Sequence, residues 1–262
     1  PDTLISKVYY NLIDSSLTAI VTHDGNVEDG AGYTANITVP ATVKVNGIDY
    51  TVVGISDNAF SNCEKVKKIT IGVNVAFIGE GAFDGCSALE TIVWRPKTYS
   101  DLEESLFKGI SSLKSIEFDK VKYIPANFCK DLVLESIVVE TTKTDSLSVG
   151  ANAFKFESAE SVEWMVPMCL DFTESPFGPV KEFTFWAKSA KGNTDAEVPA
   201  YLCAGLDIEQ IFIPNNINGI GANAFKGCKN LKEVKWDAAM CADFDVAPFE
   251  NLEKMIFFLF FF

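Results

Sequence analysis

The chain has 262 residues, of which 36 are acidic and 22 basic, so its formal net charge is -14 at pH 7. Nucleic acids and anionic membrane surfaces bind basic patches, so this charge argues against both as partners. A charged partner of this chain is expected to be basic.

Neither end of the chain predicts a membrane-spanning segment. It opens at Pro1 without a methionine or a basic, apolar leader, so we expect any secretion signal to have been removed. The apolar stretch 255–262 is too short to span a bilayer, which takes about 20 residues in a helix. We interpret 255–257 as a strand and the phenylalanines after it as a truncated or artefactual end.

Residues 1–48 alternate apolar and polar side chains, which predicts β-strands. Turn dipeptides such as Asp24-Gly25 and Asn46-Gly47 separate these stretches. A solenoid needs a cap over its first coil. The sequence therefore predicts an N-terminal β-hairpin cap over 1–48, followed by a solenoid over 49–262.

From residue 49 one pattern returns about every 23 residues. A phenylalanine, or a leucine in its place, precedes an apolar residue, two polar residues and an apolar-x-apolar strand. A coil of this length can bury its apolar row only against neighbouring coils, as parallel strands about 4.8 Å apart. The period predicts a right-handed, β-rich solenoid of the α/β class with about nine coils. The phenylalanine positions are Phe60, Phe83, Phe107, Phe128, Phe154, Phe177, Leu202, Phe225 and Phe249.

A longer period of about 70 residues groups the coils into three triplets, which indicates duplication of a three-coil block. Tryptophan follows the phenylalanine in coils two, five and eight, and Asp-apolar precedes it in coils three, six and nine. We expect the tryptophans to pack in the core and the aspartates to serve in loops. The positions are Trp94, Trp164 and Trp236; Asp101, Asp171 and Asp243; and Pro-Ala-x-apolar-Cys at 125–129 and 199–203.

The clearest copies of the repeat, 78–94 and 220–236, read Ile-Gly-x-x-Ala-Phe-x-x-Cys-x-x-Leu. This pattern resembles the BspA-like, or Treponema-type, leucine-rich repeat family of bacterial surface proteins, and residues 33–40 and 47–52 resemble the way such chains begin. The resemblance implies a leucine-rich repeat solenoid, export to the cell surface, and adhesion or ligand binding. It brings no catalytic residues and no cofactor. Coils three, four, six, seven and nine lack the cysteine or the glycine of the pattern.

Residues that could carry chemistry are sparse. His23 is the only histidine and falls in a predicted hairpin turn, which disfavours a catalytic triad. The acidic run 24–30 lacks the glycine and the distal glutamate of a calcium loop. Successive members of the set Asp101, Asp171 and Asp243 would lie about 14 Å apart, which is too far for a catalytic mechanism that uses two carboxyl groups as acid and base. We predict no enzyme, no metal and no cofactor, and the rival hypothesis is a glycan hydrolase built on scattered carboxylates.

The seven cysteines contain no Cys-x-x-Cys pair and recur at fixed repeat positions, so we expect small, buried thiols instead of a metal or disulfide set. The glycines before the repeated phenylalanine are expected to allow a tight bend. The cysteines are Cys63, Cys86, Cys129, Cys169, Cys203, Cys228 and Cys241, and the glycines are Gly79, Gly150 and Gly221.

The solvent-facing positions of the strands alternate with the core row, so the concave face of the sheet is the predicted binding surface. The candidate binding patch is Val93, Arg95, Val138, Trp186 and Phe212. Trp186 and Phe212, on adjacent coils, are the first candidates for an exposed aromatic pair, and packing of both under a loop is the open alternative.

These observations predict an exported bacterial cell-surface protein that binds a protein or glycan partner through its concave face, in an adhesion-type role. Host extracellular matrix is one such partner. A structural spacer within a surface protein is the alternative, because a spacer needs the same solenoid but no binding patch.

Overall fold

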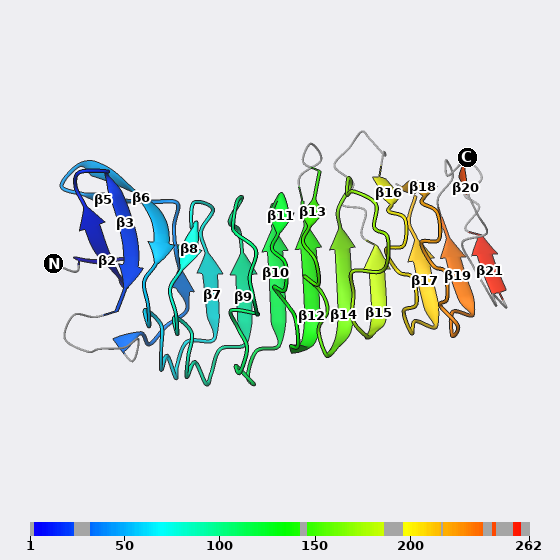
Figure 1. The fold of residues 1–262 in the computed structure, drawn as a ribbon, viewed down its shortest axis with the longest axis horizontal. Coiled ribbons are helices and arrows are strands. Elements are labelled where there is room, and N and C mark those ends of the chain that lie inside the picture. Colours follow the sequence, from blue (N-terminus) through cyan, green and yellow to red (C-terminus); the bar gives the residue numbers. More distant parts are fainter. Residues whose placement is uncertain are drawn as a thin grey trace.

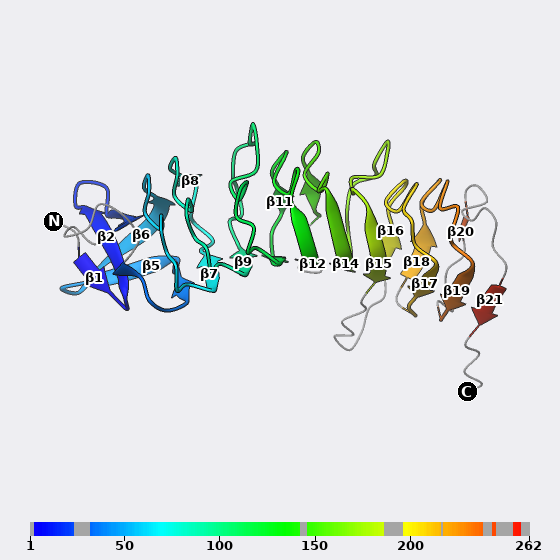
Figure 2. The same cartoon turned by 90° about the horizontal axis from the view of Figure 1, so that it is seen from below.

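The computed structural model describes residues 3–23, 32–141, 146–185, 196–215, 217–237, 243–244 and 254–257. These residues form an elongated β-solenoid in which β1 (Thr3–Ile5) and β21 (Lys254–Phe257) lie at opposite ends (Figure 1). A row of parallel strands follows one side of the solenoid, and turns follow the other (Figure 2).

The largest sheet has seven strands, ordered β15-β14-β12-β10-β9-β7-β4, and every pair in it is parallel. Equivalent residues of neighbouring coils lie opposite each other, as Ile92, Ile116 and Ile137 do. A three-stranded parallel sheet of β17, β19 and β21 continues the row. The bounds are β4 (Ile37–Thr38), β7 (Lys68–Ile71), β9 (Thr91–Trp94), β10 (Ser115–Asp119), β12 (Val133–Glu140), β14 (Ser158–Met165), β15 (Val180–Phe185), β17 (Gln210–Ile213) and β19 (Glu233–Trp236).

Shorter strands pair elsewhere in the solenoid. Two small parallel sheets, β11-β13 and β16-β18-β20, add backbone pairing between coils. At the N-terminal end, antiparallel hairpins β1-β2-β3 and β5-β6 join through a parallel β3-β6 pair, and β8 pairs with β6. The bounds are β2 (Val8–Ile13), β3 (Thr18–Thr22), β5 (Thr42–Val45), β6 (Ile48–Ile55), β8 (Phe77–Ile78), β11 (Tyr123–Ile124), β13 (Ser148–Val149), β16 (Ala196–Val198), β18 (Ile217–Ile220) and β20 (Asp243–Phe244).

Turns connect the strands, and the residues that the structure describes contain no helix. In several coils two residues four positions apart have positive φ, as Asn58 and Asn62 have at 53° and 58°. Amides there bond to carbonyls three residues back, Ser61 N to Asn58 O at 3.0 Å. A left-handed residue at every fourth position interrupts any α-helix. The α/β part of the expected fold class is therefore not confirmed in the described residues.

The core is one continuous cluster that runs through the solenoid from Val8 to Trp236. The repeated phenylalanines are buried as predicted, and their rings meet from coil to coil; the centroids of Phe60 and Phe83 are 5.8 Å apart. The three tryptophans are buried too, which confirms their core role. Five cysteines are buried, Cys169 is half-buried, and Cys241 lies outside the described residues.

Most coils have a small residue followed by a large one in the core, as Ala59 and Phe60 are in coil one. In coils four and seven this order is reversed, as in Phe128 and Cys129. The amide of Cys129 donates to the next coil, at 2.7 Å from Ala153 O, as the amide of Phe60 does in coil one. Cys129 thus occupies the place that the sequence pattern assigns to Phe128, and Phe128 occupies the alanine position. Residues 202–203 repeat the exchange.

Coils three and four meet at a pair of side-chain contacts, which we name the Asp-Ser joint. Asp101 Oδ1 accepts the amide of Ala126 at 2.8 Å and also accepts the hydroxyl of Tyr123. Ser105 Oγ donates to Phe128 O at 2.6 Å. These hydrogen bonds attach the loop of one coil to the turn of the next.

The same joint recurs between coils six and seven. Asp171 Oδ1 accepts the amide of Ala200 at 2.8 Å, and Ser175 Oγ donates to Leu202 O at 3.0 Å. The two joints share the aspartate–amide and serine–carbonyl hydrogen bonds, and their spacing of one triplet supports the three-coil period. They also give Asp101 and Asp171 the structural role that was expected of them.

The row of strands is interrupted once along its described length. β15 belongs to the seven-stranded sheet and β17 to the three-stranded sheet, and no backbone hydrogen bond between these two described strands joins them. Figure 1 shows a wider interval here than between β14 and β15. The solenoid is thus continuous in its core but divided in its sheet.

The count of nine coils and the division after residue 48 stay predictions. The ninth phenylalanine, Phe249, lies outside the described residues. β6 starts at Ile48 and pairs with β3, β5 and β8, so it contacts both sides of the expected boundary.

Candidate functional site

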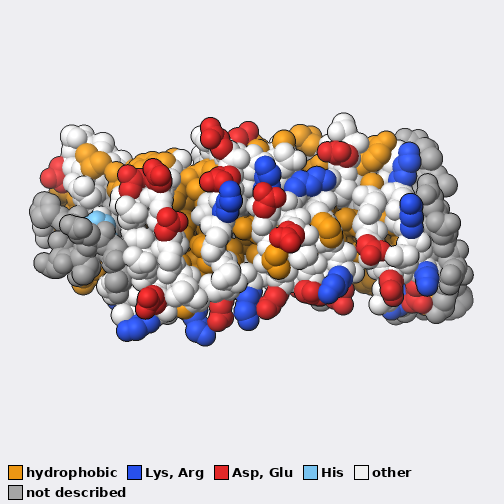
Figure 3. Space-filling model, turned by 60° about the horizontal axis from the view of Figure 1, so that its bottom comes forward, with side chains coloured by type: hydrophobic (Ala, Val, Ile, Leu, Met, Phe, Trp, Pro, Cys, Tyr) orange, Lys and Arg blue, Asp and Glu red, His pale blue; other side chains and the backbone are white. Residues whose placement is uncertain are grey.

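The solvent-facing side of the strands, here called the sheet face, presents rows of side chains in register. One row consists of the solvent-facing residue at the centre of each strand. Its two acidic members, Glu117 and Glu163, alternate with uncharged residues, and its one basic member is Lys235. Figure 3 shows acidic, basic and hydrophobic side chains intermixed over one face of the molecule. The row is Thr70, Val93, Glu117, Val138, Glu163 and Thr184, and after the interruption Phe212, Lys235 and Ile256.

Val93 is on the sheet face, but only 4% of it is exposed. It lies between Thr70 and Glu117 on the neighbouring strands. Lys68 on β7 reaches across β9 to Glu117 on β10, with Nζ 3.1 Å from Oε1. This ion pair spans the strand that carries Val93, so Val93 presents little surface to a partner.

Arg95 and Val138 have separate surroundings. Arg95 Nε donates to Asp119 Oδ2 at 2.7 Å, an ion pair with the next coil. Val138 is half-buried between Glu117 and Glu163. The predicted patch is therefore divided by acidic side chains and does not form one apolar surface.

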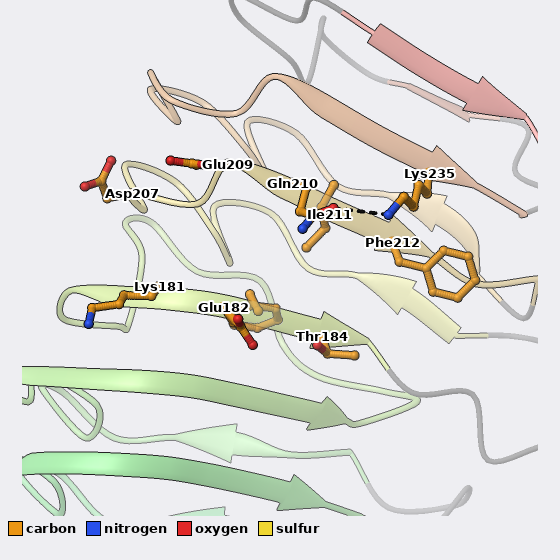
Figure 4. Close-up of a pocket in the computed structure, with 10 residues that line it drawn as sticks. Lys181, Glu182, Thr184, Asp207, Glu209, Gln210, Ile211, Phe212 and Lys235 are labelled. Atoms are coloured by element: carbon orange, nitrogen blue, oxygen red, sulfur yellow. Dashed lines mark hydrogen bonds between the residues drawn. The ribbon is translucent and has the colours of Figure 1, made fainter.

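Phe212 on β17 is the candidate with the most open surface, with 38% of it exposed. It lines a groove of about 640 Å³ at the interruption between β15 and β17 (Figure 4). Trp186, its expected partner, lies outside the described residues.

The groove between β15 and β17 is lined mainly by polar side chains. Glu182, Asp207 and Glu209 are exposed carboxylates on its rim. The two lysines that line it have acidic partners: Lys181 Nζ lies 2.7 Å from Glu160 Oε1, and Lys235 Nζ lies 3.5 Å from Glu233 Oε1. Lys235 Nζ also donates to Gln210 Oε1 at 3.1 Å. The unneutralised charge of the groove is negative.

A second hollow of about 710 Å³ borders the same junction between coils six and seven. Lys155, Ser175 and Asp207 are among its lining residues, and Asp207 also lines the first groove. Lys155 Nζ donates to Ser175 O at 2.7 Å, so its ammonium already has a carbonyl partner. Two hollows therefore border this junction.

The sequence pattern did not single out Lys181, Glu182, Asp207, Glu209 or Gln210. These residues line the groove because β15 and β17 do not pair, and the spacing of the repeats does not reveal this interruption. The step from Phe177 to Leu202 is 25 residues, and the step of 26 from Phe128 to Phe154 leaves the strand pairing of β12 and β14 intact. Step length alone therefore does not locate the groove.

The other candidate chemistry stays apart from this groove. Among the described residues no group of three or more His, Cys, Asp or Glu side chains is placed to hold a metal ion. His23 is half-buried next to 24–31, and the calcium-like run 24–30 lies outside the described residues. In the part of the chain described, no helix is long and apolar enough to span a membrane.

Solved structures with similar folds come from bacterial leucine-rich repeat proteins. One is a leucine-rich repeat protein from Bacteroides ovatus, 21% identical, covering 98% of this chain and 77% of that chain, with a TM-score of 0.39. A leucine-rich cell surface protein from Faecalibacterium prausnitzii is 15% identical, with coverages of 98% and 94% and a TM-score of 0.33. The T. pallidum leucine-rich repeat protein is 17% identical, with coverages of 93% and 91% and a TM-score of 0.34. No curated protein matches the chain.

The TM-scores are low, so the family assignment rests on the repeat itself. The family model described as BspA type leucine rich repeat region matches residues 40–160 and 196–255, with six copies. Residues 161–195, which include β15, fall between the matched ranges. The matched repeats cover more than half of the chain, which therefore belongs to the BspA-type leucine-rich repeat family.

Proposed function

We propose that this chain is an exported bacterial surface protein that binds a protein or glycan partner through its sheet face. The observation that carries this proposal is the open groove at the β15–β17 interruption, with exposed Phe212 and acidic side chains on its rim. Aromatic anchors with a polar rim are typical of binding surfaces. The proposal includes nine right-handed coils, an N-terminal cap over 1–48 and a solenoid over 49–262.

Within this proposal the five candidate residues have unequal weight. Phe212, which lines the groove, and Trp186, which lies outside the described residues, remain the aromatic candidates. Arg95 contributes charge, and Val93 and Val138 contribute little apolar surface, since both flank Glu117 in the same row. An adhesion role toward host extracellular matrix is the specific form that we propose to test.

The test is capture of partners from an extracellular matrix extract and on a glycan array, with the wild type and with Trp186→Ala/Phe212→Ala. We expect the double variant to lose binding by at least about tenfold, as for a central aromatic anchor. Phe77→Ala is the matched control, because Phe77 is also an exposed phenylalanine and lies on β8, away from the sheet face. Equal binding by all three proteins would exclude the aromatic patch as the binding site. If neither assay finds a ligand, the result favours a structural spacer.

Catalysis is not part of the proposal. Asp101 and Asp171, which would have to serve in a carboxylate hydrolase, accept backbone amides in the two Asp-Ser joints. The rival hypothesis is tested with a panel of glycoside substrates. Turnover that one Asp or Glu substitution abolishes would establish it.

A further inference from the structure

Cys63 and Cys86 occupy the same position in coils one and two. Each lies three residues after the repeated phenylalanine of its coil, which is Phe60 or Phe83. Both side chains are buried, with 0% and 2% exposed, and both carry a thiol in the structure. The candidate binding patch uses neither of them.

Backbone hydrogen bonds hold the two coils in register just before these cysteines. Amides of coil one donate to carbonyls of coil two at every second residue, and the rings of Phe60 and Phe83 stack with their centroids 5.8 Å apart. Equivalent residues of coils paired in this way lie about 4.8 Å apart, within the roughly 4.4–6.8 Å that separates the Cα atoms of disulfide-bonded cysteines. The register therefore places Cys63 and Cys86 at a distance that a disulfide can span. The hydrogen bonds are Asn58 N to Glu80 O at 3.0 Å, Phe60 N to Ala82 O at 2.9 Å and Asn62 N to Asp84 O at 2.7 Å.

The side chain of Cys86 points back toward coil one. Its Sγ donates to Phe60 O at 3.1 Å, and the amide of Cys63 donates to the same oxygen at 3.2 Å. The side chain of Cys63 also hydrogen-bonds to that of Cys86, which lowers the pKa of the Cys86 thiol. Burial instead raises the pKa of the Cys129 thiol. Because the thiolate is the form that attacks a disulfide, Cys86 is the more reactive of these buried thiols.

We propose that Cys63 and Cys86 form a disulfide that clamps coil one to coil two when the chain folds in an oxidising compartment. The oxidant is the disulfide of a small thiol or of a dithiol protein. The Cys86 thiolate attacks one sulfur of that disulfide and releases a first thiol, and the Cys63 thiolate then attacks the mixed disulfide and releases a second. The chain loses two protons and two electrons, and these reduce the oxidant to two thiols. Both sulfurs are buried after folding, so the exchange takes place while the coils close.

The clamp lies near the N-terminal end of the row of strands. β7 and β9 are the strands of coils one and two, and beyond β7 the row has only the two residues of β4 (Figure 1). A solenoid is held together by interfaces between neighbouring coils, so a covalent bond near one end opposes opening from that end. The inference goes beyond the proposed function, in which export supplies an oxidising compartment but the cysteines have no part.

Cys228 provides a comparison within the same chain. Its Sγ donates to Cys203 O at 3.0 Å, as that of Cys86 donates to Phe60 O. The residue three positions after Cys203 is Leu206, so coil seven has a leucine where coil one has Cys63. Cys203 and Cys228 are therefore three positions out of register, and we expect no disulfide between them.

Peptide mapping of the full chain tests the disulfide. The chain is exported to the periplasm of a bacterial expression host, and a second preparation is made in the reducing cytoplasm of the same host. Both are denatured in N-ethylmaleimide, which alkylates every remaining thiol, and are digested with trypsin without reductant. We expect the exported chain to yield peptides 45–65 and 69–97 joined as one species, and the cytoplasmic chain to yield them separately with both cysteines alkylated.

Thermal unfolding of the two preparations tests the clamp. We expect the exported chain to melt about 5–10 °C higher than the cytoplasmic chain, as a disulfide that closes a loop of this length does. Cys86→Ala should abolish the difference between its two preparations. Cys228→Ala is the matched control, because it removes a thiol with the same carbonyl contact, and it should keep the difference.

Each outcome supports or overturns the clamp. Alkylated Cys63 and Cys86 in the exported chain, a linked Cys203–Cys228 peptide in place of theirs, or equal melting temperatures of the two wild-type preparations would overturn it. If Cys86→Ala fails to fold, the peptide map and the two melts of the wild type decide. The host supplies the oxidising compartment, so the result is independent of any partner of the sheet face and of the proposed function.

Discussion

At the scale of single residues, a few polar side chains define how the coils meet. Asp101 accepts one hydroxyl and one amide from the next coil, and the hydrogen bond from Tyr123 is the main reason that the pKa of Asp101 lies below its ordinary value. Burial and the Asp101 contact raise the pKa of Tyr123 to about 12. The carboxylate is therefore the form that the folded state prefers.

Asp101→Asn is expected to destabilise the protein in a pH-dependent way. The pKa of Asp101 is lowered in the folded state, so its stabilising effect is present above the unfolded pKa of about 3.9 and is lost as pH falls through the folded pKa. Asp101 is exposed, so we expect a loss of about 1 kcal/mol or less at pH 7. Urea unfolding at pH 7 and pH 3 measures it, with Glu103→Gln as control. An equal loss at both pH values would contradict the linkage.

The sequence predicted which aromatic side chains are buried, but it did not predict two details of how individual residues pack. The burial of the repeated phenylalanines and tryptophans follows from the period, because one coil can bury its apolar row only against another. The exchange at Phe128 and Cys129 does not follow, since a large–small pair and a small–large pair fill a coil equally well. The low exposure of Val93 does not follow from the sequence either, because the Lys68–Glu117 ion pair that spans its strand links side chains two coils apart.

At the scale of the element, close packing of neighbouring turns explains the repeated glycines. Gly79, Gly150 and Gly221 were expected to allow a tight bend, but none of them has positive φ. A Cβ on Gly150 would lie 2.3 Å from Ala126 N, and one on Gly221 would lie 2.4 Å from Ala200 N. These glycines leave room for the backbone of the preceding coil.

Gly150→Ala is expected to destabilise the solenoid by about 1–3 kcal/mol, as overpacking against backbone does. Gly109→Ala is the comparison: Gly109 has a φ of 85° and no atom within 4 Å of an added Cβ, so only backbone strain of about 1 kcal/mol opposes the change. Thermal unfolding of both variants measures the difference. A Gly150→Ala variant as stable as wild type would refute the close-approach explanation.

At the scale of the whole molecule, the stability of a solenoid is approximately a sum of coil stabilities and nearest-neighbour interfaces. The interface between coils six and seven lacks the ladder hydrogen bonds that the other strand interfaces of the row have. It is therefore the weakest coupling along the described row. The family match also omits residues 161–195 at this place, so the sequence there departs from the repeat where the sheet divides.

We expect the coils after this interface to unfold before those that precede it. In native-state hydrogen exchange at low urea, amides of β17 and β19 should exchange through a lower-energy opening than those of β9 and β10. Asp171→Asn should widen that difference, because Asp171 supplies one of the hydrogen bonds that join coils six and seven where the strand ladder is absent. Asp101→Asn should not, since the equal joint between coils three and four is backed by the β10–β12 ladder. One cooperative opening across all strands would contradict this view.

The two equal Asp-Ser joints have a consequence for how such a chain changes its length. The first two three-coil blocks each carry an aspartate and a serine that bond to a backbone amide and a carbonyl of the block that follows, whereas the third block has Asp243 but Ala247 at the serine position. A block copied by gene duplication therefore arrives with compatible junctions at both ends. Evolution can therefore change the length of the solenoid in increments of whole blocks while keeping the same contacts between blocks.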